Sequence, residues 1–301
     1  MAGRSQGFPP VTGGTAVNRG RIWLMLSPVL AVIVCLYLGG LFLGLLQSFS
    51  YMPLIGQTEP NLEAYRAIFG QPEFWRSLVL TLEVAFGATV ISTLLAVVCA
   101  LTLRRTFRGR RIITFIFQLN LPIPHLVGGV AIIMLFTQSG LVARLARTLG
   151  LIESPSDFPA LVFDPHGIGI MLEYVWKETV FIGVILLAVL HSLGTDYEEL
   201  AASLGADPWQ QFRYVLLPLM MPGILSASII VFAFSFGAFE IPLLLGASYP
   251  VTLPVVAYRA YTDADLGARS QAMAMSMVIT AIVTLLTYGY MRLSRTYVRA
   301  R

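Results

Sequence analysis

The residues of this sequence that could take part in chemistry are few and scattered. Its three histidines, His125, His166 and His191, are followed by Leu, Gly or Ser, so the His-Glu-x-x-His motif of zinc enzymes is absent. The only lysine, Lys177, follows a tryptophan, so the chain lacks the Gly-x4-Gly-Lys-Ser/Thr loop that binds nucleotide phosphates. The sequence therefore predicts no metal site and no bound nucleotide.

Two further patterns also fail to indicate catalysis. Residues 3–7 match Gly-x-Ser-x-Gly, but that motif works only between a strand and a helix, and here it lies in a glycine-rich N-terminal segment. Cys35 and Cys99 lie in apolar runs and are too few for a disulfide framework or a cysteine zinc site. We expect no catalytic site in this chain.

The composition indicates an integral membrane protein. Of the 301 residues, 56% are hydrophobic and only 12% are charged, whereas soluble domains have about 25% charged residues. The sequence pI of about 9.2 would suit a nucleic-acid-binding protein. Here, however, the basic residues form short clusters between long apolar runs, which is typical of membrane proteins. We therefore expect a lipid bilayer, and no nucleic acid, as a partner.

Six segments have the roughly 20 apolar residues that a helix needs to cross a bilayer. The fourth must extend through Glu173, Lys177 and Glu178, and Glu173 and Lys177 are expected to neutralise each other because they are four residues apart. Pro122 and Pro124 are expected to bend the third segment, and we interpret the adjacent His125 as a structural group. The predicted spans are 22–46, 77–103, 112–136, 168–191, 215–239 and 271–291.

The distribution of basic residues sets the orientation. With the N-terminus inside, thirteen arginines lie on the cytoplasmic side and six on the outer side, which favours cytoplasmic termini. Residues 1–20 are predicted to be a disordered cytoplasmic tail, and residues 21–301 a six-helix membrane domain of all-α fold. We expect a multi-pass protein of the bacterial inner (plasma) membrane.

The outer loops are predicted at 47–76, 137–167 and 240–270. Leucines at 141, 145 and 149 indicate a short interfacial helix in the second loop. Prolines 242, 250 and 254 are expected to prevent a regular helix in the third loop.

The most informative segment is the cytoplasmic loop 194–218. Thr195 and Glu198 predict a capping box that starts a short helix, and Gly205 is placed to end it. Three acids lie in its first turn, where the helix dipole favours them. Its apolar stripe comprises Tyr197, Leu200, Ala201 and Leu204.

A second helix follows at once. Asp207 is its expected N-cap, with Pro208 first and Gln210 third. One interpretation is an amphipathic helix that lies on lipid. Such helices are usually rich in Lys and Arg, whereas this one is acidic. A helix, a turn and a second helix with defined caps favour docking to a protein.

The loop resembles the EAA loop of bacterial ABC-transporter permeases, the membrane subunits of importers that use a substrate-binding protein. Leu200 departs from the pattern, because an alanine usually stands there. The six-span layout extends the resemblance to most of the chain. The matching residues are Glu199-x-Ala201-x3-Gly205-Ala206 and Phe212-x2-Val215-x-Leu217-Pro218-x3-Pro222-Gly223-Ile224.

The resemblance implies a type I ABC importer permease and its partners. These are a cytoplasmic ABC ATPase dimer that holds ATP and magnesium, a second permease subunit, identical or different, and an extracytoplasmic substrate-binding protein. It also implies that this chain itself holds no cofactor. The residues expected to couple it to the ATPase are Glu198, Glu199, Ala201, Gly205, Ala206, Asp207, Leu217 and Pro218.

The substrate is less defined by sequence. Residues 236–246 are similar to permeases of the subgroup for polyamines, ferric iron, thiamine or aminoalkylphosphonates, so a polyamine or similar cationic or amphoteric solute is expected. Acids near the outer helix ends suit a cation, although they can also pair locally. The expected pathway residues are Glu83, Trp176, Glu178, Phe236 and Glu240.

Three alternatives remain open. The permease could carry a sugar or a phosphate-containing solute. A passive channel would have no use for an acidic, doubly capped cytoplasmic helix. A membrane-embedded enzyme would need a catalytic cluster, which the sequence does not show.

Overall fold

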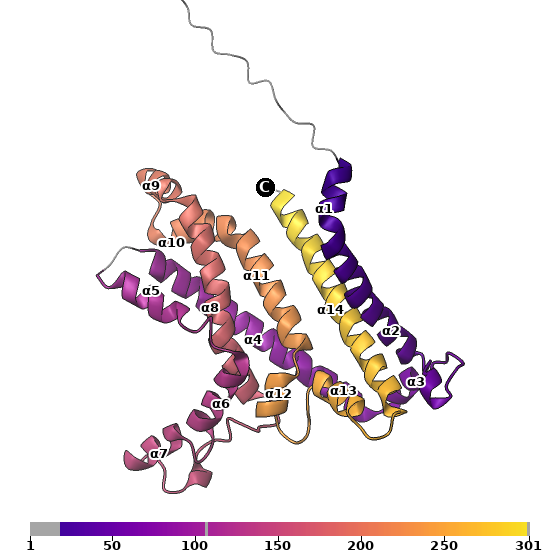
Figure 1. Ribbon diagram of the computed structural model, residues 1–301. Helices are drawn as coiled ribbons and strands as arrows, with labels where there is room; N and C mark the ends of the chain where they lie inside the picture. Colours follow the sequence, from indigo (N-terminus) through magenta and orange to yellow (C-terminus); the bar gives the residue numbers. More distant parts are fainter. Residues whose placement is uncertain (1–18, 106–107, 300–301) are drawn as a thin grey trace, which may run out of the picture.

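The computed structural model describes residues 19–105 and 108–299, and within these ranges the regular structure is helical, with no β-strand (Figure 1). Two π-helical turns, Ile33–Leu38 and Gln211–Leu216, join helices end to end. The helices are α1 (Arg19–Val32), α2 (Gly39–Ser48), α3 (Glu63–Gly70), α4 (Pro72–Arg104), α5 (Arg110–Gln118), α6 (His125–Phe136), α7 (Leu141–Thr148), α8 (Ile168–Leu193), α9 (Asp196–Ser203), α10 (Pro208–Gln210), α11 (Leu217–Gly237), α12 (Glu240–Leu245), α13 (Leu253–Tyr261) and α14 (Ala268–Arg299).

Six helical segments of the described chain are long and apolar enough to cross a membrane, which confirms the six-span fold. The start of α1, the end of α14 and the α9–α10 pair lie at one end, and α3, α7 and α13 lie at the other (Figure 1). This places both ends of the described chain on the side of loop 194–218. The segments are Ile22–Ser48, Pro72–Arg104, His125–Thr148, Ile168–Leu193, Pro208–Gly237 and Ala268–Arg292.

Part of the expected cytoplasmic tail lies outside the described residues. Of residues 1–20, only 19 and 20 are described, and both belong to α1. The Gly-x-Ser-x-Gly match at 3–7 falls in the part that is not described.

The third predicted span, 112–136, is wrong as a continuous helix. Helix α5 ends at Gln118 and α6 begins only at His125, so the expected bend is a complete break. Pro122 and Pro124 each lack a backbone N–H and each disfavour helical geometry at the residue before them. Two such residues so close together end one helix and start another. The segment long enough to cross is α6 with α7, not α5 with α6.

The outer loops contain more helix than expected. Helix α7 confirms that a helix forms where the leucines predicted one, and Leu141, Leu145 and Leu149 are exposed. The third loop is not irregular, since α12 and α13 occupy much of it. Pro254 lies in the first turn of α13, where no N–H donor is needed and the fixed φ angle suits a helix.

The core of the bundle lies between α4, α8 and α11. Ala88, Ser92, Ala96 and Ala100 of α4 are fully buried and recur every four residues. Small side chains in this spacing let helices approach closely inside a membrane, where apolar burial alone does not drive association. They bring α4 against α8, whose Leu186 is fully buried in the same cluster.

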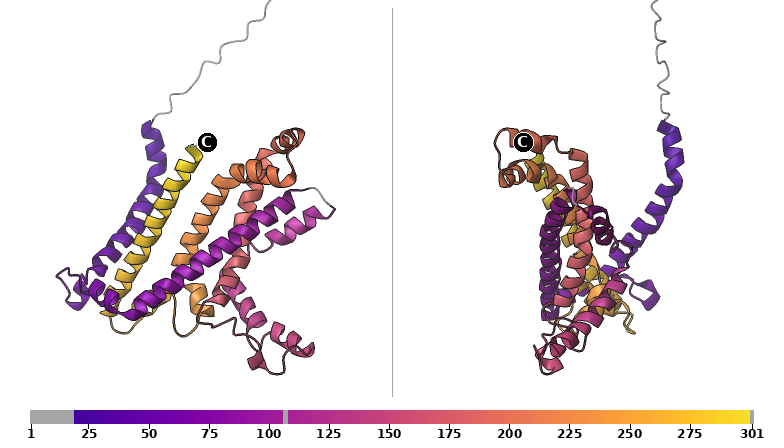
Figure 2. Two further views of the ribbon diagram at one scale, coloured as in Figure 1. Left: turned by 180° about the vertical axis from the view of Figure 1, so that it is seen from behind. Right: turned by 90° about the vertical axis from the view of Figure 1, so that its left-hand side faces the viewer.

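Helices α1 and α2 form an arm at the edge of the molecule. Helix α2 packs on α14, whereas α1 stands away from the remaining helices (Figure 2). Only 6% of the first span is buried, so nearly all of its apolar side chains are exposed in the isolated chain.

Helices α6 and α8 meet at a glycine, and this contact leads to a prediction. A Cβ at Gly128 would lie 2.8 Å from the Trp176 ring and 3.0 Å from the Glu173 carboxylate. Gly128→Ala is therefore expected to lower the unfolding free energy by about 1–3 kcal/mol through overpacking. Gly39→Ala is the control, because nothing lies within 4 Å of its Cβ position. Thermal unfolding of both variants in detergent measures the difference, and equal midpoints would contradict the close contact.

Candidate functional site

The first helix of loop 194–218 ends in a rigid turn. Gly205 has φ +85°, which glycine adopts without strain, and its N–H donates to the Ala202 carbonyl at 2.9 Å. The Ala206 N–H donates to the Ala201 carbonyl at 3.0 Å. These two bonds form a Schellman motif, which satisfies the last carbonyls of α9.

The second helix begins with a full capping box, as predicted. Asp207 Oδ1 accepts from the Gln210 N–H at 2.8 Å, and the Asp207 N–H donates to Gln210 Oε1 at 3.0 Å. Helix α10 then continues through the π-helical turn into α11, with Leu217 and Pro218 half-buried at the junction. A proline ring clashes with the carbonyl four residues earlier in an α-helix, and the wider π turn before Pro218 relieves that clash.

The start of α9 differs from the predicted capping box. Thr195 makes no side-chain cap to the backbone, and its hydroxyl instead donates to Glu199 Oε1 at 2.9 Å. Glu198 forms an ion pair with Arg104 at the end of α4. Arg104 also donates to the Gly194 carbonyl at 3.1 Å. Arg104 therefore holds the start of α9 through an ion pair and a carbonyl contact, without capping its N–H groups, and no local spacing in the sequence relates Arg104 to Glu198.

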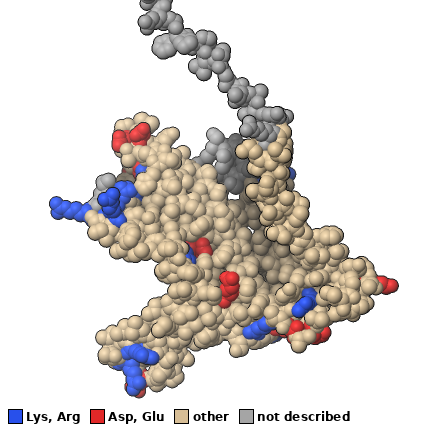
Figure 3. Space-filling model, in the orientation of Figure 1, with Lys and Arg blue, Asp and Glu red and all other residues tan. Residues whose placement is uncertain are grey.

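The loop presents an apolar surface to the surroundings. Ala201 is 9% exposed and packs inward, whereas Leu200 is 62% and Leu204 81% exposed. Tyr197 and Trp209 are also exposed. Acidic side chains gather over α9, and basic ones lie beside it near α5 (Figure 3). We call the exposed side chains of Tyr197, Leu200, Leu204 and Trp209 the apolar tip.

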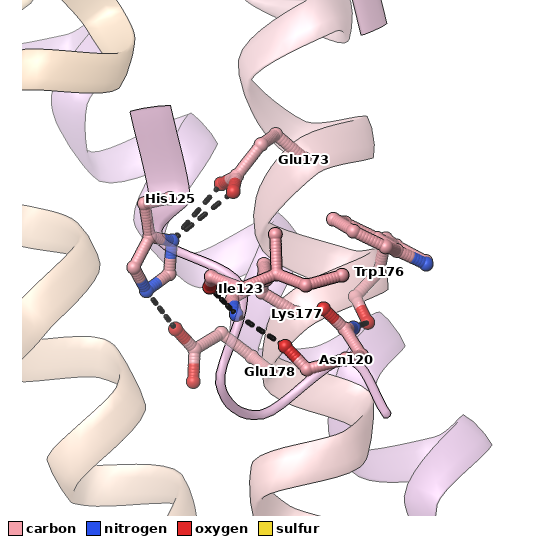
Figure 4. A network of polar contacts seen from close by, with 7 residues as sticks. All are labelled: Asn120, Ile123, His125, Glu173, Trp176, Lys177 and Glu178. Carbon is pink, nitrogen blue, oxygen red and sulfur yellow. Dashed lines mark hydrogen bonds and ion pairs between the residues drawn. The ribbon is translucent and has the colours of Figure 1, made fainter. Parts of the chain in front are cut away.

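A second polar arrangement lies deep in the bundle, where α5 and α6 break. The Lys177 ammonium of α8 donates to the Asn120 carbonyl at 2.8 Å and to the Ile123 carbonyl at 2.6 Å (Figure 4). The Asn120 side-chain amide donates back to the Trp176 carbonyl at 2.8 Å. Lys177 is 8% exposed. The lysine therefore supplies hydrogen-bond donors to the carbonyls of a turn whose prolines have no N–H group. Lipid at this depth supplies no hydrogen bond.

His125 lies between two carboxyl groups of α8. Its Nδ1 is 3.1 Å from Glu173 Oε1, and its Nε2 is 3.9 Å from Glu178 Oε1 (Figure 4). Glu173 is fully buried and Glu178 is 6% exposed. The expected pairing of Glu173 with Lys177 is wrong, because Glu173 contacts His125 while Lys177 binds the backbone of the turn. The structural interpretation of His125 agrees with these contacts.

The predicted pathway residues do not gather in one place. Glu83 is exposed and lines a cavity of about 700 Å³ between α4, α11 and α14, and Glu178 lines a separate cavity of about 230 Å³. Trp176 is 41% exposed, whereas Phe236 is fully buried. Glu240 is exposed at the start of α12. Glu83 and Glu178 thus lie in different cavities. The polar contacts around Glu178 and Lys177 also include His125 and Asn120, which the sequence could have indicated because both are polar residues close to Pro122 and Pro124.

Six spans, a capped cytoplasmic loop and a polar break deep in the bundle define a multi-pass membrane transport protein. Residues 92–299 match the family described as "Binding-protein-dependent transport system inner membrane component", and this match covers more than half of the chain. The chain belongs to this family of ABC-importer permease subunits and is a multi-pass inner-membrane protein. The family comprises transport components rather than enzymes.

Similar curated proteins have different substrates in their names. The chain is 30% identical to the molybdenum transport system permease protein ModB of Mycobacterium tuberculosis over 80% of its length and 88% of that protein. It is 25% identical to the trehalose/maltose transport system permease protein MalF of Thermococcus litoralis, over 91% of this chain and 93% of that one. The thiamine transport system permease protein ThiP of Escherichia coli is 26% identical over 72% of this chain and 39% of ThiP.

Solved structures share the fold. A chain of a bacterial ABC transporter for the acidic polysaccharide alginate superposes with a TM-score of 0.77 at 20% identity, covering 92% of this chain and 96% of that one. A chain of the inward-facing MetNI methionine ABC transporter gives a TM-score of 0.53 at 19% identity, covering 75% and 98%. The expected type I importer fold is confirmed, whereas the polyamine-type subgroup is not.

The role of Lys177 leads to a stability prediction. Lys177→Met keeps the length of the side chain but leaves the Asn120 and Ile123 carbonyls without this donor and removes a positive charge from a cluster that buries two carboxyls. Removing one partner of a buried charged network costs about 3–5 kcal/mol, so we expect a large drop in thermal stability. Hydrogen–deuterium exchange of residues 119–125 should rise as well.

Glu83→Gln is the control for Lys177→Met. It also removes a charge from a span, but the Glu83 side chain is exposed rather than buried. Its unfolding midpoint should stay close to that of the parent protein. A Lys177→Met protein as stable as this control would show that the Lys177 ammonium does not stabilise the turn between α5 and α6.

The ion pair between Arg104 and Glu198 leads to another prediction. Arg104→Met should destabilise the start of α9 by about 1–3 kcal/mol, because it removes charge-assisted hydrogen bonds. Faster hydrogen–deuterium exchange across residues 195–206 would measure this loss. The adjacent Arg105→Met is the control, since Arg105 is exposed. Exchanging both charges, Arg104→Glu with Glu198→Arg, should restore part of the protection. Equal exchange rates in the two methionine variants would show that Arg104 does not stabilise the start of α9.

Proposed function

We propose that loop 194–218 couples this permease to a cytoplasmic ABC ATPase dimer, which binds and hydrolyses ATP with magnesium. The apolar tip is the observation that supports this role. Its side chains are exposed on the cytoplasmic side although their backbone is fixed by a Schellman motif, a capping box and the Arg104–Glu198 pair. A rigid, exposed apolar surface is typical of a protein-docking site.

The coupling residues fall into two groups. Ala201, Gly205, Ala206 and Asp207 shape the turn between α9 and α10, whereas Glu198 fixes α9 to α4. Glu199 lies on the exposed side of α9. Leu217 and Pro218 lie where the loop enters α11. A movement of α9 would be passed through the turn to the continuous helical segment Pro208–Gly237, which forms the fifth span. ATP binding at the partner then biases the membrane helices between two states.

The uncovered arm of α1 and α2 supports a second permease subunit. Its side chains are apolar and exposed, and the chain alone covers only 6% of the first span. The pore is then formed by two permease subunits, identical or different. An extracytoplasmic binding protein delivers the solute to the side of α3, α7 and α13.

The proposed solute is small and cationic or amphoteric, such as a polyamine. The acids Glu83, Glu178 and Glu240 support this choice, since each lines a cavity or is exposed near the spans. The alternative is a sugar or a phosphate-containing solute, and the name of MalF, a trehalose/maltose permease, favours a sugar. The ligand of the cognate binding protein, measured by calorimetry, decides between the two solute classes.

Capture of the ATPase tests the coupling role. The tagged chain is co-expressed with its neighbouring genes and purified in detergent, and we expect an ATPase to co-purify. Gly205→Glu should reduce this recovery about tenfold or more, because a charge added to the turn weakens a docked apolar surface by more than about 1.4 kcal/mol. Nothing in the described chain lies within 4 Å of the Gly205 Cβ position, so the added side chain has room, and its cost to the fold is the backbone strain of a non-glycine residue at φ +85°.

Gly109→Glu is a matched control. Gly109 also has φ +85° with nothing of the described chain within 4 Å of its Cβ position, but it lies before α5, outside the loop. Both variants therefore carry the same backbone strain and the same added charge. Equal recovery of the ATPase with the two variants would contradict docking at the loop.

A further inference from the structure

Glu178 is a buried carboxyl group whose hydrogen-bonding capacity is not used within the described chain. It is 6% exposed, and its nearest charged neighbour is His125, whose Nε2 lies 3.9 Å from Glu178 Oε1, beyond hydrogen-bond range. A carboxylate buried without a hydrogen bond or a close counter-ion is costly, and such a group inside a membrane bundle usually marks a functional site.

The nearby cationic and donor groups are already engaged. The Lys177 ammonium donates to the Asn120 and Ile123 carbonyls, and Lys177 lines the same cavity as Glu178 (Figure 4). His125 Nδ1 is directed at Glu173, which therefore has its own partner. The cluster thus holds two carboxyls, one lysine and one histidine. Of the two carboxyls, only Glu178 lines the cavity.

The cavity beside Glu178 has the size and lining of a site for a small organic group. Its volume is about 230 Å³, just below the range of about 300–1,000 Å³ for sites that enclose whole drug-sized ligands. Phe234 lies over the His125 ring at 4.9 Å between ring centroids. Aromatic faces attract organic cations. The other apolar lining residues are Leu121, Phe181, Ile230 and Val231.

We propose that this cavity is an ammonium site on the solute's path, in which Glu178 is the counter-ion and Phe234 and Phe181 enclose the carbon body of the solute. The inference rests on the proposed transport function and adds a specificity-determining residue to it. A divalent metal ion fits poorly, because it would need six or more oxygen ligands and the lining supplies one carboxyl.

The site also lies at a part of the bundle that can change shape. Leu121 belongs to the turn between α5 and α6, Glu178 to α8, and Phe234 to α11, which continues from loop 194–218. A motion of α11 would therefore move Phe234 relative to Glu178. A solute held between them would be released by the same movement that the coupling loop transmits.

Charged thiol reagents can measure the electrostatic potential in the cavity. In a chain carrying Cys35→Ala and Cys99→Ala, Leu121→Cys places one thiol in the lining, and Ile230→Cys places a second reporter on α11. The chain, together with its ATPase where this co-purifies, is held in nanodiscs without nucleotide. The reaction rates of a cationic and an anionic methanethiosulfonate are each divided by their rates with a free thiol, which gives a cation preference.

We expect Glu178→Gln to reduce this cation preference roughly tenfold, because a unit charge a few ångströms away acts strongly in a poorly solvated cavity. Glu73→Gln is the control and should leave the preference unchanged, since Glu73 is exposed in the first turn of α4 and does not line this cavity. Putrescine and tetramethylammonium should slow the modification of both reporters, and Glu178→Gln should raise the concentration needed at least tenfold.

Several outcomes would overturn the proposal. These are a cation preference that Glu178→Gln leaves unchanged, protection by molybdate instead of the amines, protection by sodium alone, or reporters that neither reagent reaches. The assay does not depend on transport. An ATPase that co-purifies while the cation preference stays unchanged refutes only the ammonium site, whereas a failed ATPase capture refutes the coupling role whatever the thiol rates show.

Discussion

The need to satisfy polar groups inside an apolar bundle governs the centre of this protein. Pro122 and Pro124 end α5 and delay α6, which frees backbone carbonyls where lipid offers no donor. Lys177 is the donor that fills this gap. A lysine at this depth requires acids to balance its charge, and Glu173 and Glu178 supply them, with His125 between the two carboxyl groups. The break, the buried lysine and the two buried carboxyls are thus consequences of one local constraint.

A few specific contacts stabilise the cytoplasmic end of the molecule. Helix α9 is short and its helical hydrogen bonds alone would not keep it folded. Arg104 at the end of α4 fixes its start, and the Schellman turn and the Asp207 box fix its end. The loop is therefore fixed to both α4 and α11. We expect a force on the apolar tip to be transmitted to these two core helices, which a flexible linker would not do.

The sequence predicted the elements whose signals are local. Long apolar runs identify five of the six spans, whereas the third lies at His125–Thr148 instead of 112–136. Gly205 and Asp207 mark the turns of the loop because capping depends on a few adjacent residues. Long-range pairings were not predictable in this way. Glu198 pairs with Arg104 instead of capping α9, and Glu173 contacts His125 instead of Lys177. Each partner comes from a different helix, so its position depends on packing.

The substrate is the property that the sequence determines least, for a physical reason. A binding protein selects the solute, so the permease needs only a pathway that does not reject it, and relatives named for molybdenum, trehalose/maltose and thiamine share one fold. Differences in charge along the path can still exclude solutes of the wrong sign, because an unpaired charge in a poorly solvated cavity is repelled strongly. A single buried carboxyl such as Glu178 therefore carries more information about the solute than the similarity of the whole chain.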